Sequence, residues 1–405
     1  MKILFLSGLY SHSLKQEFIE QCKINSLQNA CDTFQWAVIE GLNANRSDFS
    51  VLSYPWLPCY PLNYKSSKVK SGDILYDGRC IGKSMGYSSL ILYKQFSIEN
   101  SVIKSVSRWI ENSVLEGEKF AILTYTLEPF FIKPLSKLKK KHPNMIIASI
   151  VTDLVDDIYN FKDNLSFFKR LQSWIRIKET KEGYAFIDKF ILLTKQMEEK
   201  IPQAIGKNIV VEGIYKNSDD IALGNRVEKS ILYTGVLEEY AGVKLLVDAF
   251  TETSCSEYRL IICGNGPLSE YISEKAHHDS RIDYRGSVSR EEAVSLQKSV
   301  SLLINPRQPN GGITKYSFPS KTMEYMSSGT PMIGYKLEGM PFEYYDYMFI
   351  PGDLSLNSLV KTINACLQFS EDELHLFGSK ARAFILNKKT AEIQVKQILD
   401  FIEKE

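Results

Sequence analysis

The stretch that decides the fold runs from residue 305 to residue 334 and reads NPRQPNGGITKYSFPSKTMEYMSSGTPMIG. It follows an apolar run, VSLLI at residues 300–304, which predicts a buried strand. Pro319 suits the first turn of a helix, because its missing N–H would be unpaired there, and Gly329 suits the end of that helix. Pro331 then opens another apolar run, PMIGY. The sequence therefore predicts a strand, a glycine-containing loop, a helix and a second strand.

Basic side chains gather around the predicted start of this helix. Arg307, Lys315 and Lys321 lie close to it in sequence, and the pair Gly311-Gly312 lets the loop backbone approach a ligand closely. The free N–H groups and the dipole of a helix N-terminus favour anions. These features indicate a phosphate-bearing ligand, with Lys315 and Lys321 as candidate catalytic contacts of a diphosphate and Arg307 as a third cation. For any single lysine, a solvated loop side chain is the plainer alternative.

The second half of the chain alternates strands and helices, which predicts a parallel sheet with helices on both faces. The expected strands are 230–234, 258–263 and 282–284, and the expected helices are 243–250 and 290–298. Ligands of such sheets bind beyond the carboxyl ends of the strands. Glycines that follow predicted strands place one site at this edge, namely Gly235, Gly264, Gly266, Gly286, Gly311 and Gly312. The turn at 264–266 lacks the third glycine of a dinucleotide fingerprint, so an NAD site is disfavoured.

The first half also reads as strands and helices, interrupted by an aperiodic segment. Strands are expected at 2–7, 50–54, 119–125, 145–151, 190–193 and 209–212, and helices at 29–42, 88–115 and 131–141. Residues 55–86, rich in Pro, Tyr, Gly and Lys, predict a surface loop excursion. The polar stretch 215–229 predicts a linker, and the last residues predict one more helix with an apolar face.

The bulk numbers describe an ordinary globular protein of two domains. The chain has 405 residues, 44% hydrophobic and 24% charged, with a formal net charge of +1, which gives no reason to expect nucleic acid as a partner. Apolar runs fall far short of the ~20 residues that span a bilayer. The seven cysteines are scattered and form no CxxC pair, so a reduced, cytoplasmic protein without a structural metal is expected.

The stretch 305–334 resembles the donor site of family 4 of the glycosyltransferases, which have the two-domain GT-B fold. That family keeps a glutamate on this helix, followed by a pattern like Glu-Ala-Met-x-x-Gly-x-Pro. The matching residues here are Glu324, Tyr325, Met326, Gly329 and Pro331. The longer string, Asn305-Pro306-Arg307 followed by KYSFPSKTMEYMSSGTP, resembles a subgroup that builds bacterial surface polysaccharides.

The resemblance implies an α/β fold of two Rossmann-like domains facing a cleft. Residues 1–214 would bind the acceptor, 215–229 would link the domains, 230–390 would bind a nucleotide sugar, and the helix in 391–405 would pack back on the first domain. The implied activity is that of a retaining hexosyltransferase, which moves a sugar from a nucleotide-diphosphate donor to a saccharide or lipid-linked acceptor. By the same resemblance no metal ion or other cofactor is required.

The resemblance also implies roles in the donor site. Glu324 would hold the nucleotide ribose, although an ion pair with Lys321 one turn earlier is the plainer alternative. Residues 286–288 would line the base by backbone contact, or would form only a turn. The donor-binding residues expected in this way are Gly235, Gly286, Val288, Arg307, Tyr316, Ser317, Phe318 and Glu324.

Two departures from the family pattern affect the chemistry. Tyr316 stands where the family commonly has a second glutamate, and no Asp or Glu occurs between Glu292 and Glu324. Val236 and Ala241 stand where the family has an arginine and a lysine. The charge of the leaving group must then be stabilised by the three cations named above and by the helix dipole. These departures favour an alternative function, a catalytically inactive nucleotide-sugar-binding partner protein; a nucleotide-sugar epimerase would need acidic residues that the sequence does not show.

On the acceptor side, Asp153 follows a predicted strand and could contact the donor sugar or the acceptor hydroxyl, although capping of a helix or turn is as good an explanation. Gly8 could let the first loop approach the donor phosphates or the acceptor, or could serve only a turn. The basic run 133–142 could touch anionic lipid headgroups, which predicts peripheral contact with the inner face of a membrane. A solvated helix face is the alternative there.

Overall fold

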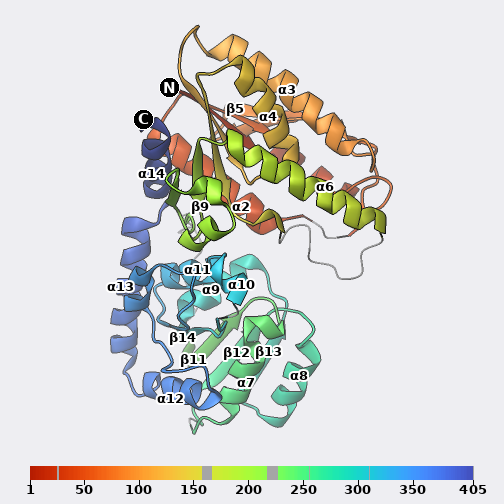
Figure 1. Cartoon of the computed structure of the whole chain (residues 1–405). Coiled ribbons are helices and arrows are strands. Elements are labelled where there is room, and N and C mark those ends of the chain that lie inside the picture. Colours follow the sequence, from red (N-terminus) through yellow and green to blue (C-terminus); the bar gives the residue numbers. More distant parts are fainter. Residues whose placement is uncertain (25–26, 157–166, 217–226, 255, 310, 405) are drawn as a thin grey trace. The chain divides into compact units, whose positions relative to one another are not determined.

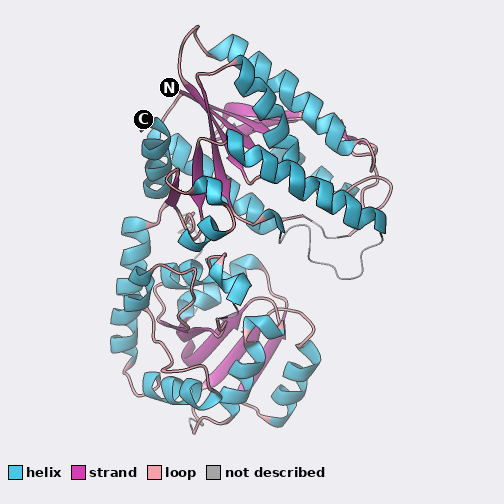
Figure 2. Ribbon diagram, viewed as in Figure 1, coloured by secondary structure: helices cyan, strands magenta, loops and turns pink. Residues whose placement is uncertain are grey.

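The computed structural model describes residues 1–24, 27–156, 167–216, 227–254, 256–309 and 311–404. The chain forms two compact units, residues 1–216 with 391–405, and residues 217–390. Both are α/β, with helices packed on the sheets (Figures 1 and 2). None of the described helices is long and apolar enough to cross a bilayer.

The first unit is built on an eight-stranded sheet in the order β10-β9-β8-β7-β1-β2-β5-β4. Its strands are β1 (Lys2–Ser7), β2 (Phe49–Ser53), β4 (Gly72–Tyr76), β5 (Arg79–Ser84), β7 (Phe120–Tyr125), β8 (Met145–Val151), β9 (Lys189–Leu192) and β10 (Asn208–Val210). The pairs from β10 to β5 are parallel, and β4 runs antiparallel to β5 at the edge. Two short strands, β3 (Lys68–Val69) and β6 (Tyr87–Ser88), pair separately and antiparallel.

The helices of this unit cover both faces of the sheet. They are α1 (His12–Gln21), α2 (Asn29–Asn45), α3 (Lys94–Ser113), α4 (Pro129–Lys141), α6 (Phe167–Gly183) and α14 (Ala391–Glu403). Helices α2 and α14 share one hydrophobic core with the sheet, while α3, α4 and α6 lie side by side across the other face (Figure 1). Short 3₁₀ helices complete the unit at Tyr184–Phe186, Lys195–Glu199 and Pro202–Ala204.

The chain end returns to the first unit. Val395, Ile398 and Ile402 of α14 are fully buried, which confirms the predicted apolar face, and the helix packs against α2. The amide of Ala391 donates to the carbonyl of Tyr215 at 3.0 Å, so the first turn of α14 is tied to the segment that leaves the sheet.

The prediction of a loop excursion over residues 55–86 was wrong for its second half, from residue 68 onward. The segment contains β3 and the β4–β5 hairpin, which extends the main sheet. The hairpin turns at Asp77 and Gly78, whose φ angles are +47° and +75°. Two positive φ angles fit the tight turn that Asp-Gly favours, because this turn matches the twist of paired strands. The Asp-Gly signal was present in the sequence but was outweighed by the surrounding Pro, Tyr and Lys.

The second unit has a five-stranded parallel sheet in the order β13-β12-β11-β14-β15. Its strands are β11 (Val227–Thr234), β12 (Arg259–Cys263), β13 (Ile282–Gly286), β14 (Val300–Asn305) and β15 (Met332–Gly334). Its helices are α7 (Val243–Thr251), α8 (Ser269–His278), α9 (Arg290–Ser299), α10 (Gly311–Lys315), α11 (Ser320–Ser328), α12 (Leu356–Cys366) and α13 (Glu371–Lys388), with 3₁₀ turns at Glu239–Ala241 and Phe342–Tyr347. All six residues of β14 are buried, as expected of a parallel strand covered on both faces.

The structure confirms the predicted helix and corrects its surroundings. Helix α11 begins after Pro319 and ends at Gly329, which has a φ of +84°. The loop before it is not wholly irregular, since the short helix α10 starts at Gly311. The predicted linker 215–229 was too long. Its residues 217–226 lie outside the described part of the chain, but β11 already begins at Val227.

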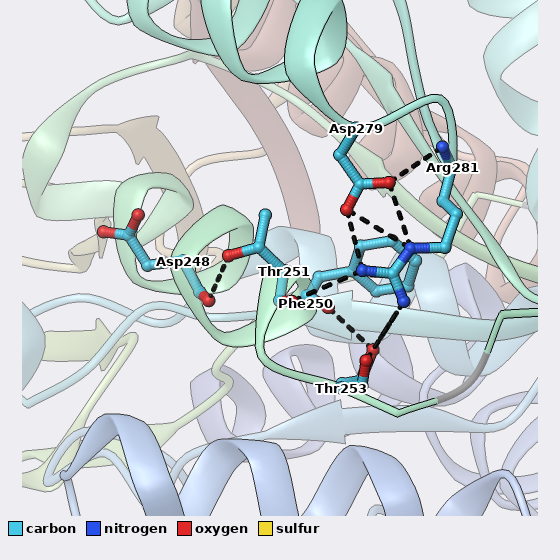
Figure 3. Close-up of polar contacts among 6 residues, drawn as sticks. All are labelled: Asp248, Phe250, Thr251, Thr253, Asp279 and Arg281. Carbon is cyan, nitrogen blue, oxygen red and sulfur yellow. Dashed lines mark hydrogen bonds and ion pairs between the residues drawn. The ribbon is translucent and has the colours of Figure 1, made fainter.

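The far end of the second unit is held by one arginine (Figure 3). Arg281 donates from Nε and Nη2 to both carboxylate oxygens of Asp279, at 3.0 and 2.7 Å, and from Nη1 to the carbonyl of Thr253 at 3.1 Å. Its guanidinium also lies over the ring of Phe250, 5.0 Å from the centroid. The hydrogen bonds from Arg281 lower the pKa of the Asp279 carboxyl. This cluster joins the end of α7 to the start of β13 and serves stability, because it lies at the amino ends of the strands.

Candidate functional site

The carboxyl ends of the strands in the second unit meet in a tightly packed set of glycines. The amide of Gly235 donates to the carbonyl of Cys263 at 2.9 Å, and the amide of Gly264 donates to the carbonyl of Gly286 at 2.7 Å. Gly235 and Gly264 have φ angles of +150° and +149°, and a side chain on Gly264 would collide with the carbonyl of Gly235. The loops after β11, β12 and β13 are therefore held together by backbone hydrogen bonds. At these glycines the edge of the sheet presents peptide groups that no side chain covers.

Lys321, in the first turn of α11, reaches this edge. Its ammonium donates to the carbonyl of Thr234, the last residue of β11, and lies 4.7 Å from the centroid of the Tyr233 ring. A side chain at Gly235 would occupy the position of the ammonium. Burial lowers the pKa of Lys321 from 10.5 to about 8, with the charge of Glu324 opposing the shift. Lys321 is thus a partly desolvated cation at a helix N-terminus. A bound anion would stabilise its charged form and so offset the hydration that burial removes.

Glu324, one turn further along α11, presents an exposed carboxylate that is held at one oxygen. Nε2 of Gln297 donates to Oε1 of Glu324 at 2.5 Å and to Oγ1 of Thr234 at 3.1 Å. Gln297 lies on α9 and is 1% exposed, and its Oε1 has no hydrogen-bond partner. Among the described residues Glu324 forms no direct ion pair with Lys321, which was the plainer alternative, and its second oxygen has no hydrogen-bond partner there.

Helix α11 is itself fixed in place by α13, which packs against it. Gly378 of α13 lies against the carbonyl of Gly329, so close that a side chain there would overlap it. Nη1 of Arg382 donates to the carbonyl of Ser327 at 2.6 Å, which places a cation at the C-terminal end of the α11 dipole. These contacts hold Lys321 and Glu324 at fixed positions along the edge of the sheet.

Replacing Gln297 with leucine is expected to weaken nucleotide binding roughly tenfold, because Glu324 would lose the donor that orients it. Isothermal titration with a nucleoside diphosphate measures this effect. Gln394→Leu is the matched control: Gln394 is also 1% exposed and donates to the carbonyl of Gly213, in the other unit. Equal affinities for Gln297→Leu and the parent protein would show that the orientation of Glu324 does not matter.

The remaining cations lie in the segment between β14 and α11. Nη2 of Arg307 donates to Oγ of Ser317 at 3.4 Å, and burial lowers the pKa of the guanidinium while Tyr240 opposes the shift. Lys315, the last residue of α10, places its ammonium 5.7 Å from the ring centroid of Tyr316. Arg307, Lys315, Tyr316 and Ser317 are all partly exposed. The structure thus leaves both cations within reach of solvent near the start of α11.

The other expected donor residues differ in how far their side chains or backbones are exposed. Phe318 is 8% exposed and packs on Tyr344, with ring centroids 5.1 Å apart, so its side chain belongs to the core of the unit. Gly286 has a φ of +64° with open space beside its Cα, and Val288 is partly exposed. Val236, at the position where the resemblance expects a cation, is 51% exposed.

The two candidates in the first unit lie at the carboxyl ends of β8 and β1. Asp153 is exposed, and its Oδ2 accepts a hydrogen bond from Oγ1 of Thr152 at 3.0 Å. The amide of Gly8 donates to Oε1 of Gln35 at 2.6 Å. A side chain on Gly8 would collide with the indole of Trp56, so the structure explains this glycine by packing within the protein. Ligand contacts of Asp153 and Gly8 stay predictions.

No group of three or more His, Cys, Asp or Glu among the described residues is placed to hold a metal ion. The expectation that the reaction requires no metal stays a prediction. Sequence reasoning also missed Gln297, Tyr233 and Thr234, which surround the two charged groups of α11. Their side chains carry no local signal, because they come from other elements and meet α11 only in the fold.

The second unit is similar to one known family. Residues 228–368 match a family model described as Glycosyl transferases group 1. The matched range contains every candidate donor residue from Gly235 to Glu324 and confirms the predicted enzyme class, a glycosyltransferase. A search of curated protein sequences gave no match.

Solved structures with a similar fold cover almost the whole chain. They include Anabaena Alr3699/HepE in complex with UDP (14% identity, 99% of each chain covered, TM-score 0.59). Sucrose-phosphate synthase of Thermosynechococcus elongatus aligns at 12% identity over 99% of this chain and 98% of its own, with a TM-score of 0.60. A mutant of S. aureus TarM in complex with Fondaparinux, alpha-GlcNAc-glycerol and UDP aligns at 11% identity over 100% of both chains, with a TM-score of 0.58. These likenesses confirm the predicted α/β fold of two Rossmann-like units of the GT-B type.

Proposed function

We propose that this protein is a retaining glycosyltransferase that moves a hexosyl group from a nucleotide-diphosphate donor to a saccharide or lipid-linked acceptor in polysaccharide biosynthesis. The observation that carries the proposal is the position of Lys321, a partly buried ammonium at the N-terminus of α11, beside the peptide groups at Gly235. HepE and TarM, which share the fold, were solved with UDP, so UDP is the first nucleotide to test.

In this proposal the diphosphate binds at the first turn of α11. The helix N–H groups and Lys321 stabilise the charge that develops on the leaving nucleotide diphosphate, with Arg307 and Lys315 supplementing them. The free oxygen of Glu324 accepts hydrogen bonds from the ribose hydroxyls, while residues 286–288 line the base. Asp153 meets the donor sugar or the acceptor hydroxyl. The three cations and the helix dipole take the part that a metal ion plays elsewhere.

The proposal is tested by binding and turnover together. UDP and other nucleoside diphosphates are titrated into the full chain by calorimetry, and labelled nucleotide sugars are then incubated with a pool of saccharide and lipid-linked acceptors. We expect saturable nucleotide binding and transfer of label to an acceptor, with the anomeric configuration of the donor retained in the product. Failure of every nucleotide diphosphate to bind would contradict the donor site.

A second candidate function is a nucleotide-sugar-binding partner protein without transferase activity. It is favoured by Tyr316 in place of the second family glutamate and by Val236 and Ala241 in place of the family cations. The same assay separates the two, because this candidate expects nucleotide binding without transfer of label from any donor.

We further propose a cytoplasmic protein that works at the inner face of a membrane. The basic run of α4 is poorly suited to make that contact. Nζ of Lys133 pairs with Glu179 at 2.7 Å, Lys139 pairs with Asp188, and the ammonium of Lys140 lies over the ring of Phe186. Much of its charge is therefore already paired within the unit, and a different surface must meet the lipid.

A further inference from the structure

The first unit exposes large apolar side chains on two elements that lie on either side of α4. One element is the turn that leads into α3, with Leu92 95%, Tyr93 48% and Phe96 54% exposed. The other is α6, whose Trp174 is 59% exposed. We refer to these and their apolar neighbours as the apolar surface, and its members are Leu90, Ile91, Leu92, Tyr93, Phe96, Leu171, Trp174 and Ile175. Soluble proteins expose single apolar residues commonly, whereas gathered sets of this kind mark interaction sites.

The turn before α3 presents its side chains from an ordered backbone. The prediction of a helix from residue 88 was wrong here, because α3 begins only at Lys94. The amide of Ile91 donates to the carbonyl of Tyr60 at 3.2 Å, and the amides of Tyr93 and Lys94 donate to the carbonyl of Leu90 at 2.9 and 2.7 Å. The exposure of Leu92 is therefore a property of a hydrogen-bonded turn.

The two halves of the apolar surface belong together. Helices α3, α4 and α6 lie side by side on one face of the sheet (Figure 1), and α4 contacts both α3 and α6. Arg176 of α6 is close enough to Lys94 to help lower the pKa of that lysine, although burial is the larger cause. Residues Leu171, Trp174 and Ile175 are spaced i, i+3 and i+4, so they form one stripe along α6.

Basic groups border the apolar surface on both sides. On α6, Arg170 is exposed, and the ammonium of Lys178 lies 5.6 Å from the ring centroid of Trp174 and forms only a long, exposed ion pair with Glu182 at 3.9 Å. Near the turn, Nζ of Lys23 donates to the carbonyl of Pro61 at 2.5 Å, and both Lys23 and Lys65 are exposed beside the 59%-exposed Leu62. Protruding aliphatic and aromatic side chains with a border of cations complement a lipid surface that carries negative headgroups.

We propose that the first unit docks on an anionic phospholipid bilayer through this surface. Leu92 and Phe96 would enter the acyl boundary, Trp174 and Tyr93 would lie at the headgroup level, and the bordering cations would meet the lipid phosphates. A bilayer suits these residues better than a protein groove, because Leu92 protrudes almost completely. This docking rests on the proposed work at a membrane and names the surface for it, but it does not depend on nucleotide binding, so it can fail while the donor site stands.

The test is co-sedimentation of the full chain with vesicles, without nucleotide. We expect binding to vesicles that contain phosphatidylglycerol and much weaker binding to phosphatidylcholine alone. Leu92→Glu and Trp174→Glu should each reduce vesicle binding at least roughly tenfold. Each removes an apolar side chain that the bilayer would bury, and each adds an anion. Leu115→Glu is the matched control, because Leu115 follows the other end of α3 and is 78% exposed.

Three outcomes decide the matter, with circular dichroism confirming that each variant is folded. Loss of vesicle binding in both surface variants but not in Leu115→Glu supports the proposal. Absence of vesicle binding by the parent, or unchanged binding by the surface variants, overturns it. The proposal is also overturned if the parent protein does not bind vesicles but forms a dimer that Leu92→Glu dissociates. That result would assign the surface to a second copy of this chain. UDP titration of the same variants should give the parent affinity.

Discussion

Replacing Lys321 with methionine should strongly weaken nucleotide binding and, in the same protein, stabilise the fold. Methionine keeps the unbranched length of the side chain but carries no charge. A nucleoside diphosphate would lose its buried cationic contact, which we expect to weaken binding roughly 100-fold, about 2.7 kcal/mol. The ammonium is held where burial lowers its pKa to about 8, which corresponds to a cost of about 3 kcal/mol against the ordinary value. Loss of its hydrogen bond to Thr234 offsets part of that gain.

The pH dependence of stability gives an independent check on Lys321. Between about pH 8 and pH 10.5 the unfolded chain binds the proton of this lysine while the folded chain has released it. The free energy of unfolding therefore gains a contribution that rises with pH across this window and is constant below it. The Lys321→Met variant should lack that rise. Nucleotide affinity of the parent should fall as the pH passes 8, because the ammonium loses its charge.

Thermal and chemical unfolding, calorimetric titration with UDP and the same measurements on Lys336→Met check these expectations. Lys336 is the matched control, because it is exposed and its ammonium also lies over a tyrosine ring, 5.7 Å from the centroid of Tyr345. Its replacement should change neither stability nor affinity noticeably. A Lys321→Met protein that binds UDP like the parent would contradict the donor site.

The helix that carries Lys321 could be predicted because its signals are local. Pro319 fixes a backbone angle that suits a first turn, and Gly329 adopts the positive φ that ends the helix. The same local logic failed for residues 55–86, where the two residues that specify a hairpin, Asp77 and Gly78, sit in a composition typical of loops. Turn chemistry at two positions outweighed the average over the segment.

The site was harder to predict than the helix, because its contacts join distant parts of the chain. Lys321 was identified from its position at a helix start, but the carbonyl of Thr234 that holds it comes from a strand 87 residues away. Gln297 lies 27 residues before Glu324 and reads in sequence as an ordinary polar residue of a helix. Only the packing of α9 against α11 gives that glutamine its place beside the carboxylate.

Replacing Gly235 with alanine should weaken nucleotide binding, although glycine itself has no side chain that could contact the nucleotide. The φ of +150° is strained for alanine, and its Cβ would occupy the position of the Lys321 ammonium. We expect Gly235→Ala to cost about 2 kcal/mol of stability and to weaken UDP binding roughly 30-fold, because the ammonium must leave the carbonyl of Thr234. Unfolding curves and calorimetric titration measure the two effects separately.

Gly206→Ala separates strain from crowding. Gly206 has a φ of +75°, and nothing lies within 4 Å of the position that a Cβ would take. This control should lose stability through strain and keep the parent affinity for UDP.

The double variant Gly235→Ala with Lys321→Met tests whether the two substitutions act through the same group. If both substitutions act through one ammonium, alanine should cost little further affinity once methionine is present, whereas two independent effects would add. Additive losses of affinity would mean that the peptide edge at Gly235 contacts the nucleotide without the help of Lys321.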